Sequence, residues 1–238
     1  MRAAVIANVS DADTGLVGRA LRRRGYSMAE YLREQHETWP GLDGIDLVVS
    51  MGSGWSVYWE HVSAPVSAEQ ALMLTAHEAG LPILGICFGA QQLATVLGGE
   101  VTKAQSPEIG WCQVHSVPET AHLAPSVMFE GAWMQWHYDR FSVPAGATVL
   151  AQSAVGPQAI VSGRALGVQF HPEATESIVR QWSSGEGRAE LEAIGSSPEA
   201  MLATTSVEVE QSERRCDALV EWFCTHVAQG HMDTRLTR

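Results

Sequence analysis

The sequence predicts an α/β fold built on a mostly parallel central sheet with a mixed second half. Short apolar runs alternate with amphipathic stretches over residues 3–97, a pattern typical of parallel strands joined by helices. Over residues 100–169, short β-like runs separated by Pro and Gly turns replace this alternation, which indicates strands joined without helices. Because the chain has 238 residues, we expect a single domain over residues 1–238.

The first predicted strand and helix lie at the start of the chain. Residues 3–7 (AAVIA) form a short apolar run that is typical of a buried strand. Residues 13–24 follow as a helix, which Asp11 or Asp13 can cap and which Gly25 ends.

The next strand and helix repeat this arrangement. Residues 46–51 (DLVVSM) form a buried strand that ends in the loop 52–54. Residues 67–78 form a helix with one apolar side, closed by Gly80.

A third apolar strand, residues 82–86 (PILGI), runs directly into Cys87. The helix predicted over residues 89–97 ends at Gly98 and Gly99. The rest of the chain predicts four strands, 111–117, 147–151, 158–162 and 165–170, and two helices, 175–183 and 207–227. The connector between these helices, residues 184–206, is rich in Gly, Ser, Ala and Glu, and we interpret it as an insertion or a lid.

The amino-acid composition and net charge indicate which kinds of molecule the protein can bind. Hydrophobic residues make up 45% and charged residues 18% of the chain, as in ordinary soluble globular proteins. A net charge of −12 disfavours nucleic acid and anionic membranes as partners. The N-terminal apolar run reaches Asp11 too soon for a signal peptide, and the four cysteines form no CxxC pair. We therefore expect a cytoplasmic protein with free thiols.

The motif Gly85-Ile86-Cys87-Phe88-Gly89 predicts a nucleophile on a sharp turn between a strand and a helix. Small residues two places on either side let the strand and the helix approach each other closely. The positive N-terminus of the helix favours a thiolate, because it lowers a thiol pKa. The backbone N–H of Phe88 is then available to an oxyanion.

An isolated motif of this form fits a buried structural cysteine equally well. Gln91 favours a functional site, because it places an amide one helical turn beyond Cys87, on the same face.

The second motif is the strand end at residues 167–173 (GVQFHPE). Pro172 keeps His171 extended, so the imidazole leaves the strand in a defined direction. Glu173 is close enough to orient the ring and to stabilise an imidazolium. Alone, these residues are more typical of a surface turn than of a catalytic pair. However, Cys87 and His171 both follow predicted strand ends, which line up along one edge of a parallel sheet.

Other residue patterns exclude some chemistries. The sequence has no set of residues with metal-ligand spacing, no P-loop and no G-x-G-x-x-G fingerprint. We therefore expect side-chain nucleophilic catalysis without a cofactor or a metal. The loop 52–54 is consistent with a second oxyanion donor or with a flexible turn, and His137 fits a pocket wall and a structural position equally well.

Together these motifs resemble the class I (triad) glutamine amidotransferases. The similarity runs over residues 46–182 and is carried by residues 85–94 (GICFGAQQLA) and residues 167–173. Residues 135–141 (QWHYDRF) resemble the H-G-D-x-F stretch of stand-alone members and of the amidotransferase domain of GMP synthase. The resemblance implies a flavodoxin-like three-layer α/β/α sandwich.

The resemblance also implies roles for individual residues. Cys87 would attack the glutamine side-chain amide to form a γ-glutamyl thioester, while His171 moves protons and Glu173 orients it. Gly52 and Phe88 would supply the oxyanion amides. The residues assigned to substrate binding are Gln91, Gln135, Trp136 and His137. The chain departs from the family pattern at Met51-Gly52-Ser53-Gly54, which replaces Gly-Gly-Pro, and at Tyr138, which replaces the glycine of H-G-D.

Three functions remain open at this point. The first is an amidotransferase subunit that makes ammonia from glutamine for a separate synthase. The second is a stand-alone γ-glutamyl hydrolase or transferase that acts on a glutamyl conjugate through the same thioester. The third is a non-catalytic regulatory or binding protein of the same fold, against which the intact Cys-His-Glu set argues.

Overall fold

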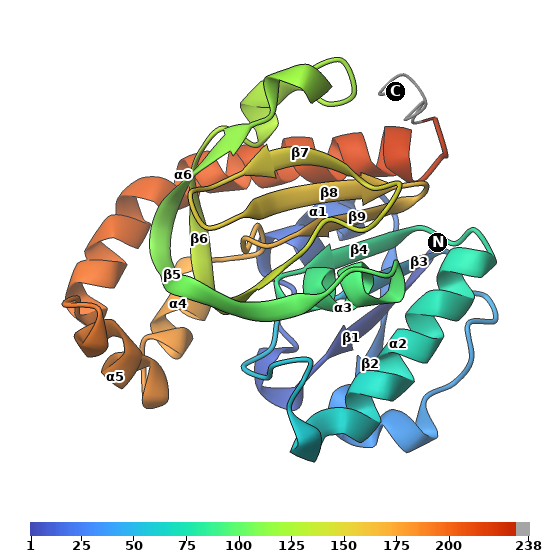
Figure 1. Cartoon of the computed structure of the whole chain (residues 1–238), viewed down its shortest axis with the longest axis horizontal. Helices are drawn as coiled ribbons and strands as arrows, with labels where there is room; N and C mark the ends of the chain where they lie inside the picture. The colour runs from blue at the N-terminus through green and yellow to red at the C-terminus, as the bar shows by residue number, and fades with distance from the viewer. Residues whose placement is uncertain (232–238) are drawn as a thin grey trace.

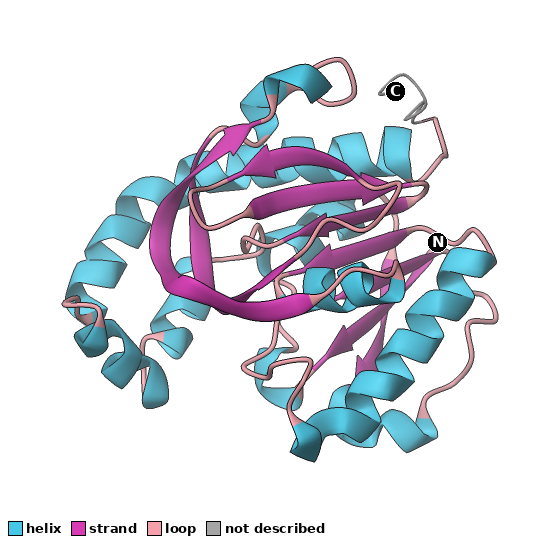
Figure 2. Cartoon of the chain, in the orientation of Figure 1, coloured by secondary structure: helices cyan, strands magenta, loops and turns pink. Residues whose placement is uncertain are grey.

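The computed structural model describes residues 1–231, so residues 232–238 of the predicted domain lie outside the described part. Within residues 1–231, nine strands form one sheet in the order β2-β1-β3-β4-β9-β8-β7-β5-β6. Helices cover both faces of this sheet (Figure 2). The predicted α/β fold is therefore confirmed.

One half of the sheet is parallel. Its strands are β1 (Arg2–Ala7), β2 (Ser27–Leu32), β3 (Leu47–Ser50), β4 (Ile83–Ile86) and β9 (Ala165–Val168). Each is parallel to its neighbours in this half. Every residue of β3, β4 and β9 is buried, which explains why Ser50 at the end of β3 is the one polar residue in these three strands.

The other half of the sheet is antiparallel, as the mixed second half of the prediction requires. Its strands are β5 (Val101–Ser116), β6 (Gly131–Phe141), β7 (Thr148–Gln152) and β8 (Pro157–Ser162). The long pair β5 and β6 curves out from the rest of the sheet (Figure 1). A bulge between Lys103 and Glu108 accompanies this bend.

The helices form the two outer layers. They are α1 (Gly15–Arg23), α2 (Ser63–Glu78), α3 (Phe88–Val96), α4 (Glu176–Trp182), α5 (Glu186–Ala193) and α6 (Pro198–Trp222). In Figure 1, α2 and α3 lie on the viewer's side of the sheet and α1 lies behind it. Leu16 of α1 and Leu219 of α6 share one core cluster, whereas Met73 of α2 and Leu93 of α3 share another. The three-layer sandwich is confirmed.

Short helical turns complete the described chain. They are 3-10 turns at Val9–Asp11, Arg33–Thr38, Glu60–Val62, Pro118–Thr120 and Ser126–Met128, and a π-helical turn at Phe223–Val227. None of the helices within residues 1–231 combines the length and the apolar character that a membrane span requires.

Three elements differ from the prediction. The edge strand β2 was not predicted, because its sequence SMAEYL mixes polar and apolar residues and most of it is only half-buried. Strand β6 was also missed. The connector 184–206 contains α5 and the start of α6, where Ser197 caps the helix by accepting a hydrogen bond from the Ala200 N–H and Pro198 occupies the first turn.

Candidate active site

Cys87 lies on a strained turn between β4 and α3. Its φ of 51° and ψ of −106° make it the one non-glycine residue with a positive φ in the described part of the chain. The flanking glycines have no room for a side chain. A Cβ at Gly85 would lie 2.5 Å from the Gly89 carbonyl oxygen, and a Cβ at Gly89 would lie 2.1 Å from the Ser50 carbonyl oxygen. Strain of this kind persists only where the surrounding structure enforces it, and it is typical of active sites.

Cys87 is almost fully buried, at 3% exposure of the residue. The Gln169 side-chain amide donates a hydrogen bond to it at 3.5 Å, and the Trp136 carbonyl oxygen lies 4.0 Å from it. The sulfur also lies at the N-terminus of α3, the positive end of the helix dipole. The sulfur therefore has both an amide donor and a carbonyl acceptor beside it.

His171 and Glu173 form a buried pair beyond the end of β9. The carboxylate oxygen Oε1 of Glu173 lies 2.7 Å from the ring nitrogen Nδ1 of His171. The Trp182 ring packs edge-on against the imidazole with 4.6 Å between the ring centroids. Burial alone would lower the pKa of His171, but the Glu173 carboxylate and the Cys87 sulfur together raise it well above its usual value.

The backbone holds both members of this pair in place. The His171 N–H donates to the Met134 carbonyl of β6, and the Glu173 carbonyl accepts from the Leu16 N–H at the start of α1. At this contact Gly15 has a φ of +45°, and a Cβ there would lie only 1.9 Å from the Glu173 oxygen. A glycine is therefore required where α1 meets the pair.

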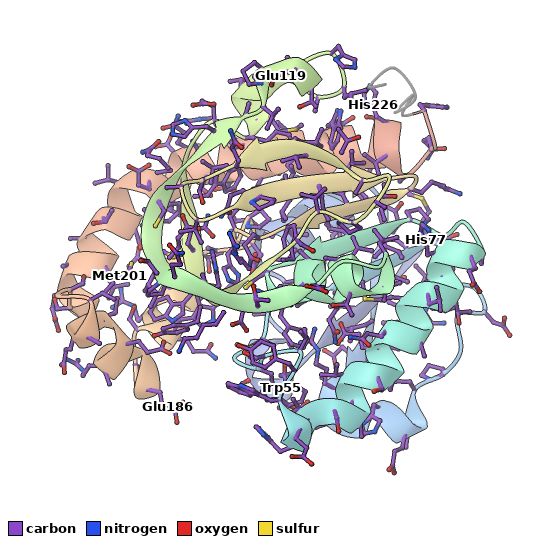
Figure 3. All side chains as sticks on the ribbon, in the orientation of Figure 1. Trp55, His77, Glu119, Glu186, Met201 and His226 are labelled. Atoms are coloured by element: carbon purple, nitrogen blue, oxygen red, sulfur yellow. The ribbon has the colours of Figure 1, made fainter. Side chains whose placement is uncertain are left out.

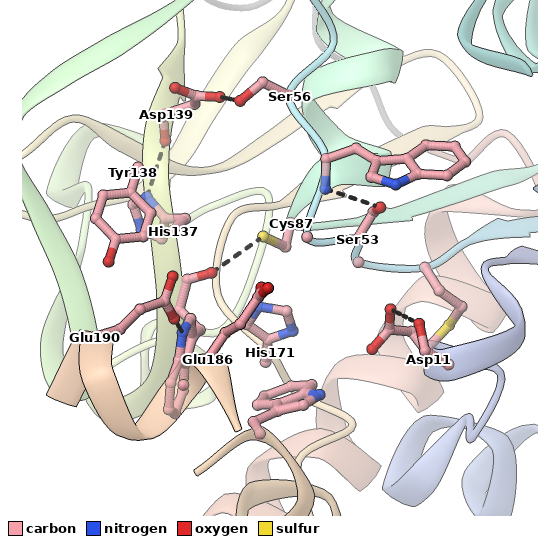
Figure 4. A pocket seen from close by; sticks show the side chains of 18 of the residues that line it. Asp11, Ser53, Ser56, Cys87, His137, Tyr138, Asp139, His171, Glu186 and Glu190 are labelled. Carbon is pink, nitrogen blue, oxygen red and sulfur yellow. Dashed lines mark hydrogen bonds between the residues drawn. The ribbon is translucent and has the colours of Figure 1, made fainter. Parts of the chain in front are cut away.

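Cys87, His171 and Glu173 line one cavity of about 650 Å³. Gly52 lies between the first two: a Cβ at this glycine would be 2.8 Å from His171 Cε1 and 3.7 Å from Cys87 Cβ. Figure 4 shows the sulfur and the imidazole on neighbouring walls of the cavity. His171 Nε2, the ring nitrogen not used by Glu173, has no hydrogen-bond partner within the described chain. It is free to exchange a proton with a thiol or with a leaving group.

The two residues predicted to donate to an oxyanion, Gly52 and Phe88, lie on the two backbone segments next to Cys87. Phe88 is the first residue of α3, so its N–H has no partner within the helix. Gly52 follows Met51, which comes directly after β3, and lines the cavity together with its neighbours in the loop.

Three of the four predicted substrate-binding residues line the cavity: Gln91, Trp136 and His137. Gln91 donates to Gln169 Oε1 at 3.3 Å, and His137 Nδ1 lies 2.9 Å from the Asp139 carbonyl oxygen. The structure does not bring Gln135 to the cavity. Its side chain is fully buried and donates to Gln158 instead, at 2.7 Å.

Several residues that line the cavity or touch the sulfur were not singled out from the sequence. Gln169 and Asp139 lie inside the two matched motifs, so the motifs themselves were an available signal. Asp139 accepts hydrogen bonds from Ser56 at 2.5 Å and from Tyr58 at 2.7 Å, which ties the loop after β3 to β6.

Part of the cavity wall is formed by residues that lie outside the sequence motifs. Glu190 of α5 accepts a hydrogen bond from the Trp136 indole at 2.6 Å. Trp55, on the loop after β3, and Glu186 of α5 also line the cavity, and both lie toward the lower edge of Figure 3. Burial and the nearby Glu190 carboxylate raise the pKa of the Tyr138 phenol. Only the tertiary fold brings α5 to this opening.

Comparison with known proteins places these features in a family. A family profile described as "Glutamine amidotransferase class-I" matches residues 16–181. Two relatives are both named "GMP synthase [glutamine-hydrolyzing]". The one from Aeropyrum pernix is 36% identical over 165 residues, which cover 66% of this chain and 30% of the relative. The one from Thermosipho melanesiensis is 33% identical over 189 residues, which cover 74% of this chain and 34% of the relative.

A solved structure matches almost the whole chain. The crystal structure of a glutamine amidotransferase from Thermotoga maritima superposes with a TM-score of 0.83 at 28% identity, covering 94% of this chain and 98% of that one. The GMP synthases are much longer, and this chain spans only about a third of the two described above. The profile match extends over most of the chain and includes Cys87 and His171. The chain therefore belongs to the class-I glutamine amidotransferase family.

Proposed function

We propose that this chain hydrolyses the side-chain amide of glutamine and supplies the ammonia to a separate acceptor synthase. The observation that carries the proposal is one cavity that holds a cysteine on a strained turn and a buried His171–Glu173 pair with Nδ1 and Oε1 2.7 Å apart. Membership of the class-I family supports glutamine as the amide donor.

In the first half of the reaction, the Cys87 thiolate attacks the amide carbon of glutamine. The C–S bond forms as the carbonyl π electrons move to oxygen, and the N–H groups of Gly52 and Phe88 stabilise the oxyanion. His171, as an imidazolium, gives its proton to the amide nitrogen. The C–N bond then breaks, ammonia leaves and a γ-glutamyl thioester remains.

In the second half, neutral His171 takes a proton from water as the water oxygen attacks the thioester. The C–S bond breaks and glutamate leaves. Glu173 keeps Nδ1 of the ring protonated throughout, so that Nε2 is the nitrogen that gives and takes protons.

We place the acceptor chemistry outside these 238 residues. The GMP synthases match this chain over only 30% and 34% of their own length. The name of those relatives is consistent with an amidotransferase that works with a synthase. Which acceptor this chain serves is tested by identifying the synthase that co-purifies with it.

The cavity favours a second candidate, a hydrolase or transferase that acts on a γ-glutamyl conjugate. A volume of about 650 Å³ is in the range of pockets that hold drug-sized ligands. Besides the triad, its lining includes Trp55 and Trp59 on the loop after β3 and Glu186 and Glu190 on α5. A group attached to the γ-nitrogen of a glutamyl substrate would have room there.

The purified protein tests both functions. Incubation with glutamine is expected to release equal amounts of ammonia and glutamate, either from the protein alone or in the presence of its co-purified partner. Hydrolysis of γ-glutamyl amides at a kcat/KM well above that of glutamine would favour the second candidate. If neither glutamine nor any γ-glutamyl amide is turned over, with or without the partner, the proposed function is wrong.

We also propose that residues 184–206 act as a lid within the single domain. Ser184, Glu186 and Glu190 line the cavity, and the Trp136–Glu190 hydrogen bond ties α5 to β6. A lid is expected to show slower amide hydrogen exchange once Cys87 carries a glutamine-analogue adduct. Exchange that is the same with and without the adduct would mean that the segment is a fixed wall.

A further inference from the structure

Arg33 is a fully buried arginine that takes no part in the mechanism described so far. It is the first residue of the 3-10 turn Arg33–Thr38, has 0% exposure and does not line the cavity. Burying a guanidinium is costly unless it is paired and hydrogen-bonded. Here Glu69 of α2, which is also fully buried, receives hydrogen bonds from Nε at 2.8 Å and from Nη2 at 3.1 Å.

The remaining donors of Arg33 point at the loop after β3. Nη2 donates to the Met51 carbonyl at 2.9 Å, and Nη1 donates to the Gly52 carbonyl at 3.1 Å. Nη1 also donates to the Asn8 side chain at 2.9 Å. One planar guanidinium therefore holds two consecutive carbonyl groups of the loop.

These two bonds determine where the amide groups of the loop point. A trans peptide is planar, with its N–H directed opposite to its C=O. Because the Met51 carbonyl faces Arg33, the Gly52 N–H faces away from it, and the Gly52 carbonyl constrains the Ser53 N–H in the same way. Met51, Gly52 and Ser53 all line the cavity, which Arg33 does not reach. Gly52 also lies against Cys87 and His171.

Arg33 also contacts the residue that carries the other oxyanion donor. Its guanidinium carbon lies 4.7 Å from the centre of the Phe88 ring, the side chain directly after Cys87. A single side chain thus touches the backbone of the loop after β3 and the side chain that directly follows Cys87.

We propose that Arg33 is a positioning residue that orients the oxyanion hole before substrate binds. Through the two carbonyl groups it turns the Gly52 N–H toward the cavity, and its guanidinium packs on the ring of Phe88, the residue that carries the second donor. The inference rests on the proposed function, since it assumes that an oxyanion forms at Cys87. Preorganised donors of this kind stabilise a transition state without affecting the nucleophile itself.

Arg33→Lys is the test, because lysine keeps the charge opposite Glu69 but lacks the planar fork that holds two carbonyls at once. The matched control is Arg215→Lys. Arg215 is also buried, donates to the carbonyls of Glu130 and Ala132, and lies 4.8 Å from the centre of the Trp133 ring. Arg215 does not line the cavity. The two variants therefore lose the same kind of contact at different places.

Three quantities are measured: kcat and KM for glutamine, the rate of Cys87 alkylation by iodoacetamide, and Tm. Alkylation needs the thiolate but no oxyanion hole. We expect Arg33→Lys to lower kcat about 10- to 100-fold. We expect KM to change by less than about threefold, because the lost interaction exists only in the transition state. The alkylation rate stays within about twofold of the wild type, since the thiolate is untouched. Arg215→Lys is expected to lower Tm without lowering kcat.

Two results would overturn the inference. One is a kcat for Arg33→Lys within threefold of the wild type; the other is an equal fall of kcat and alkylation rate, which would indicate general damage to the site. If Arg33→Lys does not fold, Glu69→Gln replaces it as the test. This variant weakens the ion pair that holds Arg33, and its kcat and alkylation rate are compared in the same way. A wild type that hydrolyses no glutamine, even with its co-purified partner, would instead refute the proposed function and this inference with it.

Discussion

Cys87→Ala is expected to lower the rate of glutamine hydrolysis by at least about 10⁴-fold, since removing a covalent nucleophile removes the route through an intermediate. Cys87 is the cysteine that lines the cavity, beside His171 and at the N-terminus of α3. The KM for glutamine cannot be compared when no turnover remains, so binding is followed directly by calorimetry. Alanine removes only the sulfur, and the fold is expected to remain intact.

Cys112→Ala and Cys224→Ala are the matched controls. Burial raises the pKa of both thiols to about 11, and both are half-buried and outside the cavity. Both variants should hydrolyse glutamine at the wild-type rate. A glutamine-analogue electrophile is expected to label Cys87 alone, as read by mass spectrometry of peptides. Labelling at Cys112, Cys216 or Cys224, or turnover that survives Cys87→Ala, would refute the assignment.

Glu173→Gln is expected to lower kcat/KM about 10²- to 10⁴-fold and to move its alkaline limb to lower pH. The carboxylate keeps Nδ1 of His171 protonated through the 2.7 Å contact, whereas a glutamine amide can turn its own N–H toward that atom and favour the other tautomer. Loss of the carboxylate also removes the largest influence that raises the His171 pKa. The imidazolium then loses its proton at a lower pH.

The direction of this shift follows from the His171 pKa. In the folded wild type that pKa lies well above 6.5, because Glu173 and then Cys87 outweigh the effect of burial. The imidazolium, which the proposed mechanism uses to protonate the leaving nitrogen, is therefore fully present below pH 6.5 and is lost only as the pH rises through the raised value. Glu173→Gln brings this loss closer to pH 6.5. The pH dependence of kcat/KM reports it.

Glu176→Gln is the control for this substitution. Glu176 lies three residues further along and is exposed, and its one ion pair within residues 1–231 is with Arg180 on the same helix. It makes no contact with His171, so neither the rate nor the alkaline limb should change. An alkaline limb that stays in place in Glu173→Gln would show that Glu173 does not control the imidazole.

Much of the fold was visible in the sequence because it depends on local patterns. Strands β1, β3, β4 and β9 are buried apolar runs, and a run of this kind is visible without knowing what covers it. Helices α1, α2 and α3 were predicted from their periodicity and their closing glycines. Strand β2 was not visible, because an edge strand is half-exposed and its sequence lacks a clear period.

The candidate triad was also visible in the sequence, but for a different reason. The turn at Cys87 needs Gly85 and Gly89, since any Cβ there would collide with a backbone oxygen, and this requirement appears as a short motif. His171 and Glu173 are two residues apart, so their contact lies within one three-residue segment of the sequence. Catalytic groups whose geometry depends on residues close in the chain can therefore be recognised as short sequence motifs.

The tertiary structure alone decided how these segments meet and what surrounds them. Arg33 and Gly52 are 19 residues apart, and Gln169 and Cys87 are 82 apart. No local pattern encodes such contacts, because they arise only when separate strands and turns pack against one another. Packing between distant segments also brings α5 to the cavity and directs the Gln135 side chain to Gln158 instead of to the cavity. The sequence by itself determined the reactive groups and their local geometry, whereas packing over long distances decided their polar partners, the orientation of the loop amides and the shape of the cavity.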